Sequence, residues 1–316
     1  MRRVALIYNP ASGQHSGRRA SYIQSALAVL RKAGIEAEAL ETHAPGSGKA
    51  LALAAVRQGY DAVLACGGDG TVHEVLQPLV GTKVALGVVP LGTANALAQN
   101  LGLGRNPVKA VRALLDARPM EVPVGRIFFH DTHGARGWRY FTVAAGIGAD
   151  ALLMSSMDPE LKRRFGYALY MLEAFKIWAS HPFPLFNASF SINGNGEPRV
   201  EQVSQLLAIR IRSFGGALGE LAPGATLQKK DLSLVAFKTR SRLEYMRFLL
   251  ATLAGRQTFS RSIELLDADA VDCRPMNGSK TRVFVEADGE VLGALPARME
   301  LAKETLTLLV PQGAQP

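Results

Sequence analysis

The chain has 316 residues, of which 48% are apolar and 20% are charged, and its formal net charge is +9. This length and apolar content exclude a disordered chain and allow two domains with sizeable cores. Two distant cysteines provide neither a disulfide framework nor a metal-ligand spacing, which favours a reducing cytoplasm, and no apolar run approaches the roughly 20 residues of a membrane span.

The first 120 residues alternate between short apolar runs and segments with helical spacing. We expect strands at residues 4–8, 35–41, 62–66 and 84–89, and helices at residues 17–32, 47–57, 72–79, 94–100 and 107–117. This alternation is typical of a parallel sheet covered by helices on both faces, where ligands bind at the carboxyl ends of the strands.

Beyond about residue 120, strand-like segments become frequent and Gly- or Pro-bearing turns separate them. We expect these strands at residues 122–129, 139–145, 186–192, 203–212, 232–238, 262–268, 282–286, 299–302 and 305–309. One helical stretch, residues 158–180, interrupts them. The pattern favours an antiparallel β-sandwich and places a domain boundary near residue 120.

Glycine and hydroxyl residues follow the expected parallel strands. The third strand runs into residues 67–71 (Gly-Gly-Asp-Gly-Thr), the first into residues 9–13 (Asn-Pro-Ala-Ser-Gly) and the fourth into residues 90–95, and Thr42 ends the second. Each motif alone is as typical of a plain turn. Together, at one sheet edge, they predict a nucleotide-sized groove whose backbone N–H groups bind phosphate.

Two acidic segments of the sequence stand out, one in this groove and one much later in the chain. Asp69 stands among the expected N–H donors, where a carboxylate would hold hydrated Mg²⁺ or accept a structural hydrogen bond. Asp288, Gly289 and Glu290 follow a much later strand, and by itself their Asp-Gly pair favours a hairpin turn.

Six segments in this order resemble the soluble diacylglycerol kinase and sphingosine kinase family of lipid kinases. They are residues 9–13, residues 67–75, residues 90–95, Gly-Ile-Gly at 146–148, Ala-Pro-Gly-Ala at 222–225 and Asp-Gly-Glu at 288–290. The resemblance implies an α/β nucleotide-binding domain (1–122) similar to those of NAD kinases and phosphofructokinases. It also implies a β-sandwich lipid domain (123–298) and a C-terminal segment (299–316) that returns to the first domain.

The resemblance also implies transfer of the γ-phosphate of MgATP to a lipid hydroxyl, with diacylglycerol the favoured acceptor and phosphatidate the product. Glu290 is then the general base with Asp288 beside it, and Asp69 belongs to the Mg²⁺ network. Such a transfer needs positioning, charge stabilisation and a proton acceptor. The implied nucleotide contacts are Asn9, Ser12, Thr42, Gly67, Gly68, Asp69, Gly70, Thr71, Val72, His73, Glu74, Gly92, Thr93 and Asn95.

Three positions depart from the family pattern. Ala96 stands where many bacterial members carry Asp, which is closer to sphingosine kinases and leaves the choice of lipid open. Lys229 and Lys230 stand where members bind a structural Mg²⁺, with Asp231 out of register, so we expect an ammonium in place of that metal. His73 replaces an Asn, and a surface helix position is as well supported as a nucleotide contact.

The basic triplet at residues 162–164 suggests transient contact with an anionic membrane, so we expect a cytoplasmic protein peripheral at the inner membrane face. The aromatic residues between 165 and 183 are typical of a core-packed helix. No nucleic-acid motif is present, and a homodimer is left open. Two alternatives remain: an NAD kinase, which shares the Gly-Gly-Asp-Gly loop, and a catalytically weak lipid- or nucleotide-binding regulator.

Overall fold

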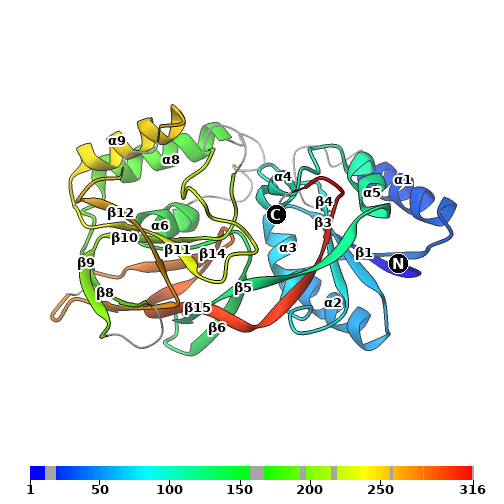
Figure 1. Cartoon of the computed structure of the whole chain (residues 1–316), viewed down its shortest axis with the longest axis horizontal. Coiled ribbons are helices and arrows are strands. Elements are labelled where there is room, and N and C mark those ends of the chain that lie inside the picture. Colours follow the sequence, from blue (N-terminus) through cyan, green and yellow to red (C-terminus); the bar gives the residue numbers. More distant parts are fainter. Residues whose placement is uncertain are drawn as a thin grey trace. The chain divides into compact units, whose positions relative to one another are not determined.

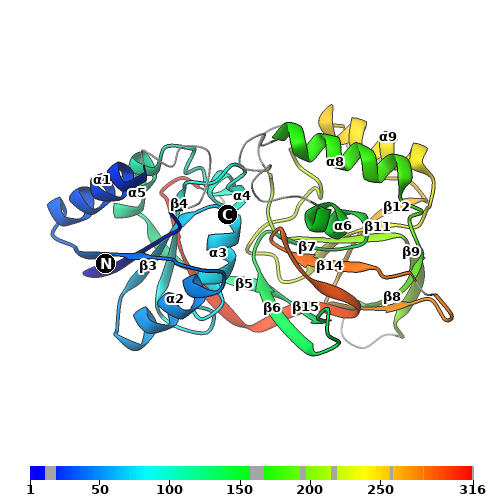
Figure 2. The ribbon, with the colours of Figure 1, turned by 180° about the vertical axis from the view of Figure 1, so that it is seen from behind.

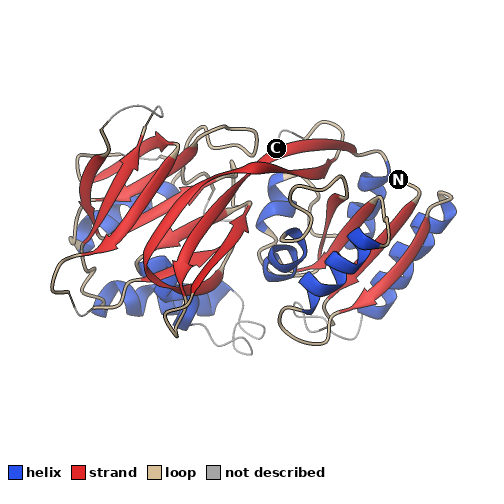
Figure 3. Cartoon of the chain, turned by 90° about the horizontal axis from the view of Figure 1, so that it is seen from below, coloured by secondary structure: helices blue, strands red, loops and turns tan. Residues whose placement is uncertain are grey.

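The computed structural model describes residues 1–10, 19–156, 167–192, 197–214, 219–256, 259–279 and 281–314. The chain divides into two compact units (Figure 1). Unit 1 comprises residues 1–124 and 303–316, and unit 2 comprises residues 125–302. Strands dominate unit 2, whereas strands and helices alternate in unit 1 (Figure 3).

Unit 1 is built on a parallel sheet. Its strands lie in the order β4 (Ala85–Pro90), β3 (Ala62–Gly67), β1 (Arg3–Tyr8) and β2 (Glu36–Glu41). Every residue of β3 and β4 is buried, as expected where helices cover both faces of a parallel sheet. The register aligns the carboxyl ends of the four strands along one edge.

Five helices of unit 1 are described. They are α1 (Arg19–Lys32), α2 (Ser47–Arg57), α3 (Asp69–Leu76), α4 (Ala96–Asn100) and α5 (Pro107–Leu115). The helix pair α1 and α5 and the helix pair α2 and α3 flank the strands on opposite sides (Figures 1 and 2). The start of α5 shows why its sequence forms a helix. The Asn106 side chain accepts a hydrogen bond from the Lys109 amide (3.0 Å), and proline follows at the first helical position.

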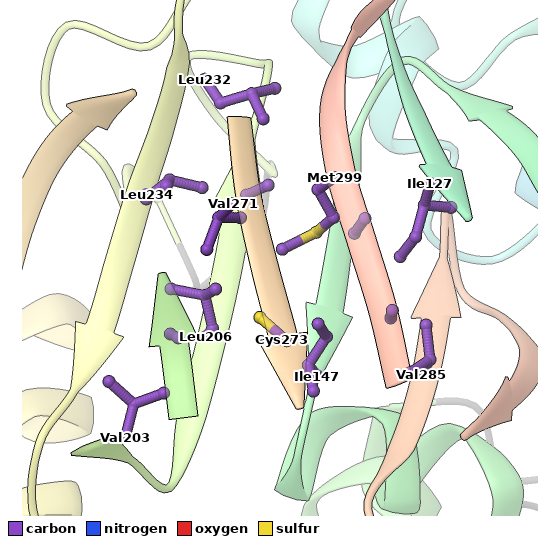
Figure 4. Packing of buried hydrophobic residues seen from close by; sticks show 14 of the residues in the cluster. Ile127, Ile147, Val203, Leu206, Leu232, Leu234, Val271, Cys273, Val285 and Met299 are labelled. Carbon is purple, nitrogen blue, oxygen red and sulfur yellow. The ribbon is translucent and has the colours of Figure 1, made fainter. Parts of the chain in front are cut away.

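Unit 2 contains antiparallel strands that pack around one large apolar core. One series runs β12 (Ile263–Ala268), β11 (Leu232–Phe237), β10 (Gln205–Ile209), β7 (Ala144–Ile147), β14 (Phe284–Ala287) and β15 (Glu290–Val310). The others are β5 (Arg118–His130), β6 (Arg136–Phe141), β8 (Phe186–Ser191), β9 (Arg199–Val203) and β13 (Ala270–Pro275). Side chains such as Ile147, Leu206, Val271 and Met299 meet between these strands (Figure 4).

The expected architecture, a parallel α/β domain and an antiparallel β-sandwich, is confirmed. The end of β15 pairs in parallel with β4 of unit 1, through Leu308 and Leu86. The two short strands expected at residues 299–309 are parts of this single strand. The strands β9 and β13 were not anticipated.

Three helices of unit 2 are described, α6 (Ala149–Ser156), α8 (Tyr167–Ser180) and α9 (Arg242–Leu253), and α8 and α9 lie side by side (Figure 2). The sequence analysis expected neither α6 nor α9. In α9, Phe248 is buried while Leu243 and Leu250 are exposed, so apolar residues on both faces obscure its helical periodicity. Among the expected core aromatics, Phe183 is buried but Phe175 is 57% exposed. None of the described helices combines the length and apolar content needed to cross a membrane.

Candidate functional site

The loops that follow β3 and β4 touch each other at the carboxyl edge of the unit 1 sheet. A β-carbon on Gly92 would lie 2.4 Å from the Cα of Gly68, and one on Gly67 would lie 2.3 Å from the Oγ1 of Thr71. A side chain at Gly92 would therefore force these loops apart, and one at Gly67 would displace Thr71 at the start of α3. Thr93 is exposed and Gly68 is half-buried, so the main chain of both loops is open at this edge.

The helix α3 begins at Asp69, directly after β3, and ends at Leu76, whereas we expected residues 72–79. The first N–H groups of a helix have no acceptor within it, and they form the positive end of its dipole. The start of α3 therefore presents donors at the edge where a phosphate was expected.

The carboxylate of Asp69 joins α3 to the start of α4. Its Oδ2 accepts a hydrogen bond from the amide of Asn95 (3.0 Å), and its Oδ1 accepts one from the amide of Ala96 (2.7 Å). Asn95 adopts a left-handed conformation (φ 52°), and its side-chain amide forms two hydrogen bonds of 2.8 Å with the main chain of Gly92. Of the two expected roles of Asp69, the structural hydrogen bond is thus present.

Glu74 makes a comparable link on the other side of α3. Its Oε1 accepts from the amide of Gly46 (2.7 Å) and its Oε2 from that of Gly48 (2.9 Å), at the start of α2. Thr42 is buried, and its amide donates to the carbonyl of Tyr8 (2.9 Å). Both predicted residues therefore lie at the carboxyl edge and organise the loop after β2.

The remaining predicted nucleotide contacts of unit 1 differ in position. The Asn9 amide donates to the carbonyl of Cys66 (3.3 Å), which joins the end of β1 to β3. Val72 is buried in α3. His73 is also buried, only 4% exposed, so the expectation of a surface histidine is wrong. Its ring faces inward because α3 packs on β3 and α2. Ser12 lies outside the described residues.

The sequence analysis did not identify Arg19 as a member of this region. Arg19 is buried at the start of α1, and its guanidinium donates to the carbonyl of Pro10 in the turn after β1. A cation opposes the dipole at a helix N-terminus. An arginine near the expected start of a helix is therefore unfavourable unless it has another role, and this was the available signal for Arg19.

The acidic segment of unit 2 is a two-residue hairpin turn between β14 and β15, which we call the 288–290 turn. Ala287 pairs with Glu290, and both central residues have positive φ angles, 50° at Asp288 and 85° at Gly289. This is the backbone of a type I′ turn, for which Asp-Gly is a favoured pair. The hairpin interpretation is therefore correct for the backbone.

The two acidic residues of the 288–290 turn lie in different environments. The Asp288 carboxylate is buried and accepts from the amides of Thr142 (3.1 Å), Val143 (2.8 Å) and Ala144 (3.1 Å). The Asp288 amide donates in turn to the carbonyl of Ala144 (2.8 Å). Glu290 is exposed to solvent. Asp288 thus fixes the turn to the segment before β7, and Glu290 projects from a fixed position.

Models of known protein families match both units of the chain. The model of the diacylglycerol kinase catalytic domain matches residues 3–127, and that of the YegS C-terminal NAD kinase beta sandwich-like domain matches residues 142–310. The chain is 30% identical over 297 residues to a YegS-like lipid kinase of Chromohalobacter salexigens, covering 92% of this chain and 89% of the relative. The chain belongs to the diacylglycerol kinase and YegS-like family of lipid kinases.

Three further proteins resemble this chain over most of its length. The chain is 27% identical to a diacylglycerol kinase of Bacillus subtilis, covering 94% of this chain and 92% of the relative. A crystal structure of a diacylglycerol kinase from Bacillus anthracis shares the fold with a TM-score of 0.70 and 17% identity, covering 99% of this chain and 98% of that chain. Yeast NADH kinase shares the fold more distantly, with a TM-score of 0.54, 10% identity and coverage of 98% of this chain and 84% of that chain.

The loop in which this chain departs from bacterial members contains side-chain cations. The Nζ of Lys229 lies 2.5 Å from the Oδ1 of Asp267 and 3.0 Å from the Oγ of Ser233. Burial lowers the pKa of Arg210 to about 10. Its guanidinium donates to three main-chain carbonyls, those of Leu227, Lys229 and Asp231. These contacts support an ammonium at the place of the second metal, and the missing metal stays a prediction.

Proposed function

We propose that this protein transfers the γ-phosphate of ATP to a lipid hydroxyl, with diacylglycerol as the acceptor and phosphatidate as the product. The observation that carries the proposal is the pair of apposed glycine loops at the start of α3, in a chain whose two domains both match diacylglycerol kinase and YegS-like models. Phosphoryl transfer depends mainly on positioning and charge stabilisation, and such loops supply main-chain donors for both.

The nucleotide phosphates would lie against the main chain of residues 68–71 and 92–93. The donor chemistry fits MgATP, because amides bind the phosphate oxygens and Asp69 adds a carboxylate. Both oxygens of Asp69 already accept amide hydrogens, so Asp69 would hold Mg²⁺ through a bound water. Bound Mg²⁺ would neutralise negative charge on the phosphate oxygens.

Glu290 is the proposed general base. It is exposed, and the neighbouring Asp288 holds its turn in place through three main-chain amides. A lipid hydroxyl must lose its proton as it attacks phosphorus, and a positioned carboxylate can accept that proton. We assign Glu290 to proton transfer and Asp288 to positioning, because the lone pairs of Asp288 are already engaged inside the protein.

Unit 2 offers a candidate site for an acyl chain. A cavity of about 280 Å³ lies between α6, α8 and β14, and its apolar lining includes Leu152, Ile177, Pro184, Val283 and Phe284. Apolar cavities with a few polar groups are typical of lipid and small-molecule sites. This cavity supports a lipid acceptor rather than a dinucleotide acceptor.

The outer faces of α8 and α9 support transient contact with an anionic membrane. Exposed apolar side chains on them are Leu172, Phe175, Leu243, Leu250 and Leu253. Lys176, Arg242 and Arg247 lie on the same two helices. Apolar side chains that enter the interface beside cations that meet anionic headgroups are typical of peripheral membrane surfaces. The basic triplet 162–164, which we expected at this contact, lies outside the described residues.

One transfer assay tests the function. Protein, Mg²⁺ and γ-labelled ATP would be incubated with mixed micelles of diacylglycerol, monoacylglycerol, phosphatidylglycerol or a sphingoid base, and separately with NAD. We expect label in phosphatidate. Label in another lipid would change the acceptor, label in NADP would establish the NAD kinase alternative, and no label in any acceptor would favour a regulator.

A further inference from the structure

Two buried carboxyl groups meet beneath the 288–290 turn. A β-carbon on Gly146 would lie only 1.6 Å from the Oδ2 of Asp150, so the Asp150 carboxyl group occupies the space of the missing side chain. Gly146 is the cross-strand partner of Glu286 on β14. Since the β-carbons of such partners lie about 5 Å apart, the carboxyl group of Asp150 stands beside the side chain of Glu286.

Within the part of the chain that the structure describes, neither group is paired with a cation that would stabilise an ionised carboxylate. Glu286 is 6% exposed, and its Oε2 accepts a hydrogen bond from the amide of Gly289 (2.8 Å). Asp150 is partly exposed as a residue, but its Oδ1 is buried and has no hydrogen-bond partner among the described residues. Two adjacent carboxylates in an apolar site cannot both be charged, so the pair retains a proton.

The electrostatics of the neighbourhood agree with this geometry. Burial raises the pKa of Asp150 to about 7. Burial also raises the pKa of Glu286 well above its usual range, and the charges of Asp150, Asp288 and Glu290 raise it further. Among the amides nearby, those of Asp150 and Ala151 lower the pKa of Asp150, and that of Gly289 lowers the pKa of Glu286.

Other titratable groups stand on the elements packed around the pair. They are Tyr245 on α9, Arg136, Arg139 and Tyr140 on β6, and Glu173 and Lys176 on α8. The strand β7, on which Gly146 lies, and its neighbour β10 carry no titratable side chain, whereas β15, which pairs with β14, carries Glu290, Arg298, Glu300, Lys303 and Glu304. Among the described residues, no lysine or arginine is paired with Asp150 or Glu286, so the retained proton takes the place of a counter-charge.

We propose that Asp150 and Glu286 share a proton and act as positioning residues, with Glu286 holding the amide of Gly289 and thereby fixing where Glu290 projects. The inference rests on the proposed function, in which Glu290 accepts the proton of the acceptor hydroxyl. When the pair loses its last proton, repulsion between the two buried charges displaces the turn. Turnover then falls as the pH rises.

Two substitutions of Glu286 distinguish the effect of its charge from the effect of its hydrogen-bond acceptor. Glu286→Gln keeps an oxygen for the Gly289 amide and removes one of the two charges. Loss of the last proton then causes no repulsion, so we expect near-normal kcat at pH 7 without the alkaline fall of the parent enzyme. Glu286→Leu removes the acceptor, and we expect kcat to fall about tenfold or more at unchanged KM for ATP, because small displacements of a base are costly. Glu197→Leu, which removes an exposed carboxylate of unit 2, is the control.

Two kinetic results would overturn the proposal: full kcat in folded Glu286→Leu, or the same pH profile in Glu286→Gln and the parent enzyme. Hydrogen–deuterium exchange over residues 284–292 tests the pair without any substrate. We expect faster exchange there in Glu286→Leu only, and unchanged exchange would also sink the proposal. A parent protein that phosphorylates no acceptor would refute the proposed function, while the exchange measurement would still decide whether Glu286 holds the turn.

Discussion

Asp69 and Asp288 belong to different units, but both carboxylates hold main-chain amides of a neighbouring segment. Asp69 holds two amides at the start of α4, and Asp288 holds three in the segment before β7. Asp69 and Asp288 therefore both have structural roles, but they hold different groups in place. Asp69 fixes a set of N–H donors, whereas Asp288 fixes a single exposed carboxylate, Glu290.

This difference assigns complementary chemistry to the two regions. The glycine loops of unit 1 present donors that suit phosphate oxygens, and the 288–290 turn of unit 2 presents an acceptor that suits a proton. Changes in unit 1 should therefore act on nucleotide binding as well as turnover. Changes at the end of the 288–290 turn should act on turnover alone.

Glu290→Gln is expected to separate turnover from ATP binding most clearly. The amide keeps the shape of the side chain but cannot accept a proton, so kcat should fall by about a thousandfold, within the range for loss of a general base. The affinity for ATP, measured by calorimetry, should stay within about twofold. Comparable turnover in Glu290→Gln and the parent enzyme would remove Glu290 from the mechanism.

Asp288→Ala should instead act on stability. The substitution leaves three buried amides of residues 142–144 without their acceptor and puts alanine at a positive φ, so the free energy of unfolding should fall by about 3 kcal/mol. Asp288→Asn keeps one acceptor oxygen and tolerates the turn, and we expect a smaller loss. Urea titration of both variants checks this order. Equal stability of the alanine variant and the parent would show that the three hydrogen bonds are dispensable.

Much of the secondary structure around Asp69 and Asp288 could be predicted from the sequence, because patterns of a few neighbouring residues determine it. Apolar runs closed by glycine located β3 and β4, and the Asp-Gly pair indicated the hairpin. A structural hydrogen bond was one of the roles expected of Asp69, but the partners of Asp69 and Asp288 could not be predicted, since they are 26–27 and 144–146 positions away in the chain. Asp150 escaped notice for the same reason, because its carboxyl group is placed by Gly146 and by the pairing of β7 with β14.

Asp69→Ala should lower both turnover and nucleotide affinity. Loss of the two hydrogen bonds frees the start of α4 from α3, so the two glycine loops no longer hold one geometry. We expect kcat to fall about a hundredfold and the Kd for ATP to rise severalfold, as for a misplaced binding group. Asp69→Asn retains one acceptor oxygen, so its kcat and its Kd for ATP should lie between those of the parent enzyme and of Asp69→Ala. If Asp69→Ala binds ATP as tightly as the parent enzyme, Asp69 does not organise the main-chain N–H groups that bind the nucleotide.

Gly68 and Gly92, which face each other in the two glycine loops, allow a matched pair of substitutions. A β-carbon on Gly92 would clash with the main chain of Gly68, whereas one on Gly68 would meet only the Cα of Gly92 at 3.4 Å. Gly92→Ala should therefore lower the melting temperature, and Gly68→Ala should leave it nearly unchanged. Both should weaken ATP binding, by about tenfold for Gly68→Ala, if the ligand approaches the main chain there. Normal ATP affinity in Gly68→Ala would place the nucleotide elsewhere.

The smallest expected effect concerns the carboxyl pair, and its direction depends on pH. The pKa of Asp150 is raised to about 7, so the folded protein binds more protons than the unfolded chain between pH 4 and pH 7. The free energy of unfolding therefore falls as pH rises through this window, and the loss is complete above the folded pKa. Asp150→Asn should remove about 2 kcal/mol of the fall between pH 5.5 and pH 8.5.

Glu264 is the matched control, since its pKa is shifted in the opposite direction. Hydrogen bonds from Arg199 lower the pKa of Glu264 to about 2, so its stabilising contribution is present above its unfolded pKa and is lost only as pH falls toward 2. Glu264→Gln should then lower stability by the same amount at pH 5.5 and pH 8.5. If Asp150→Asn behaves like Glu264→Gln, with no difference between the two pH values, the buried carboxyl pair holds no proton at pH 5.5.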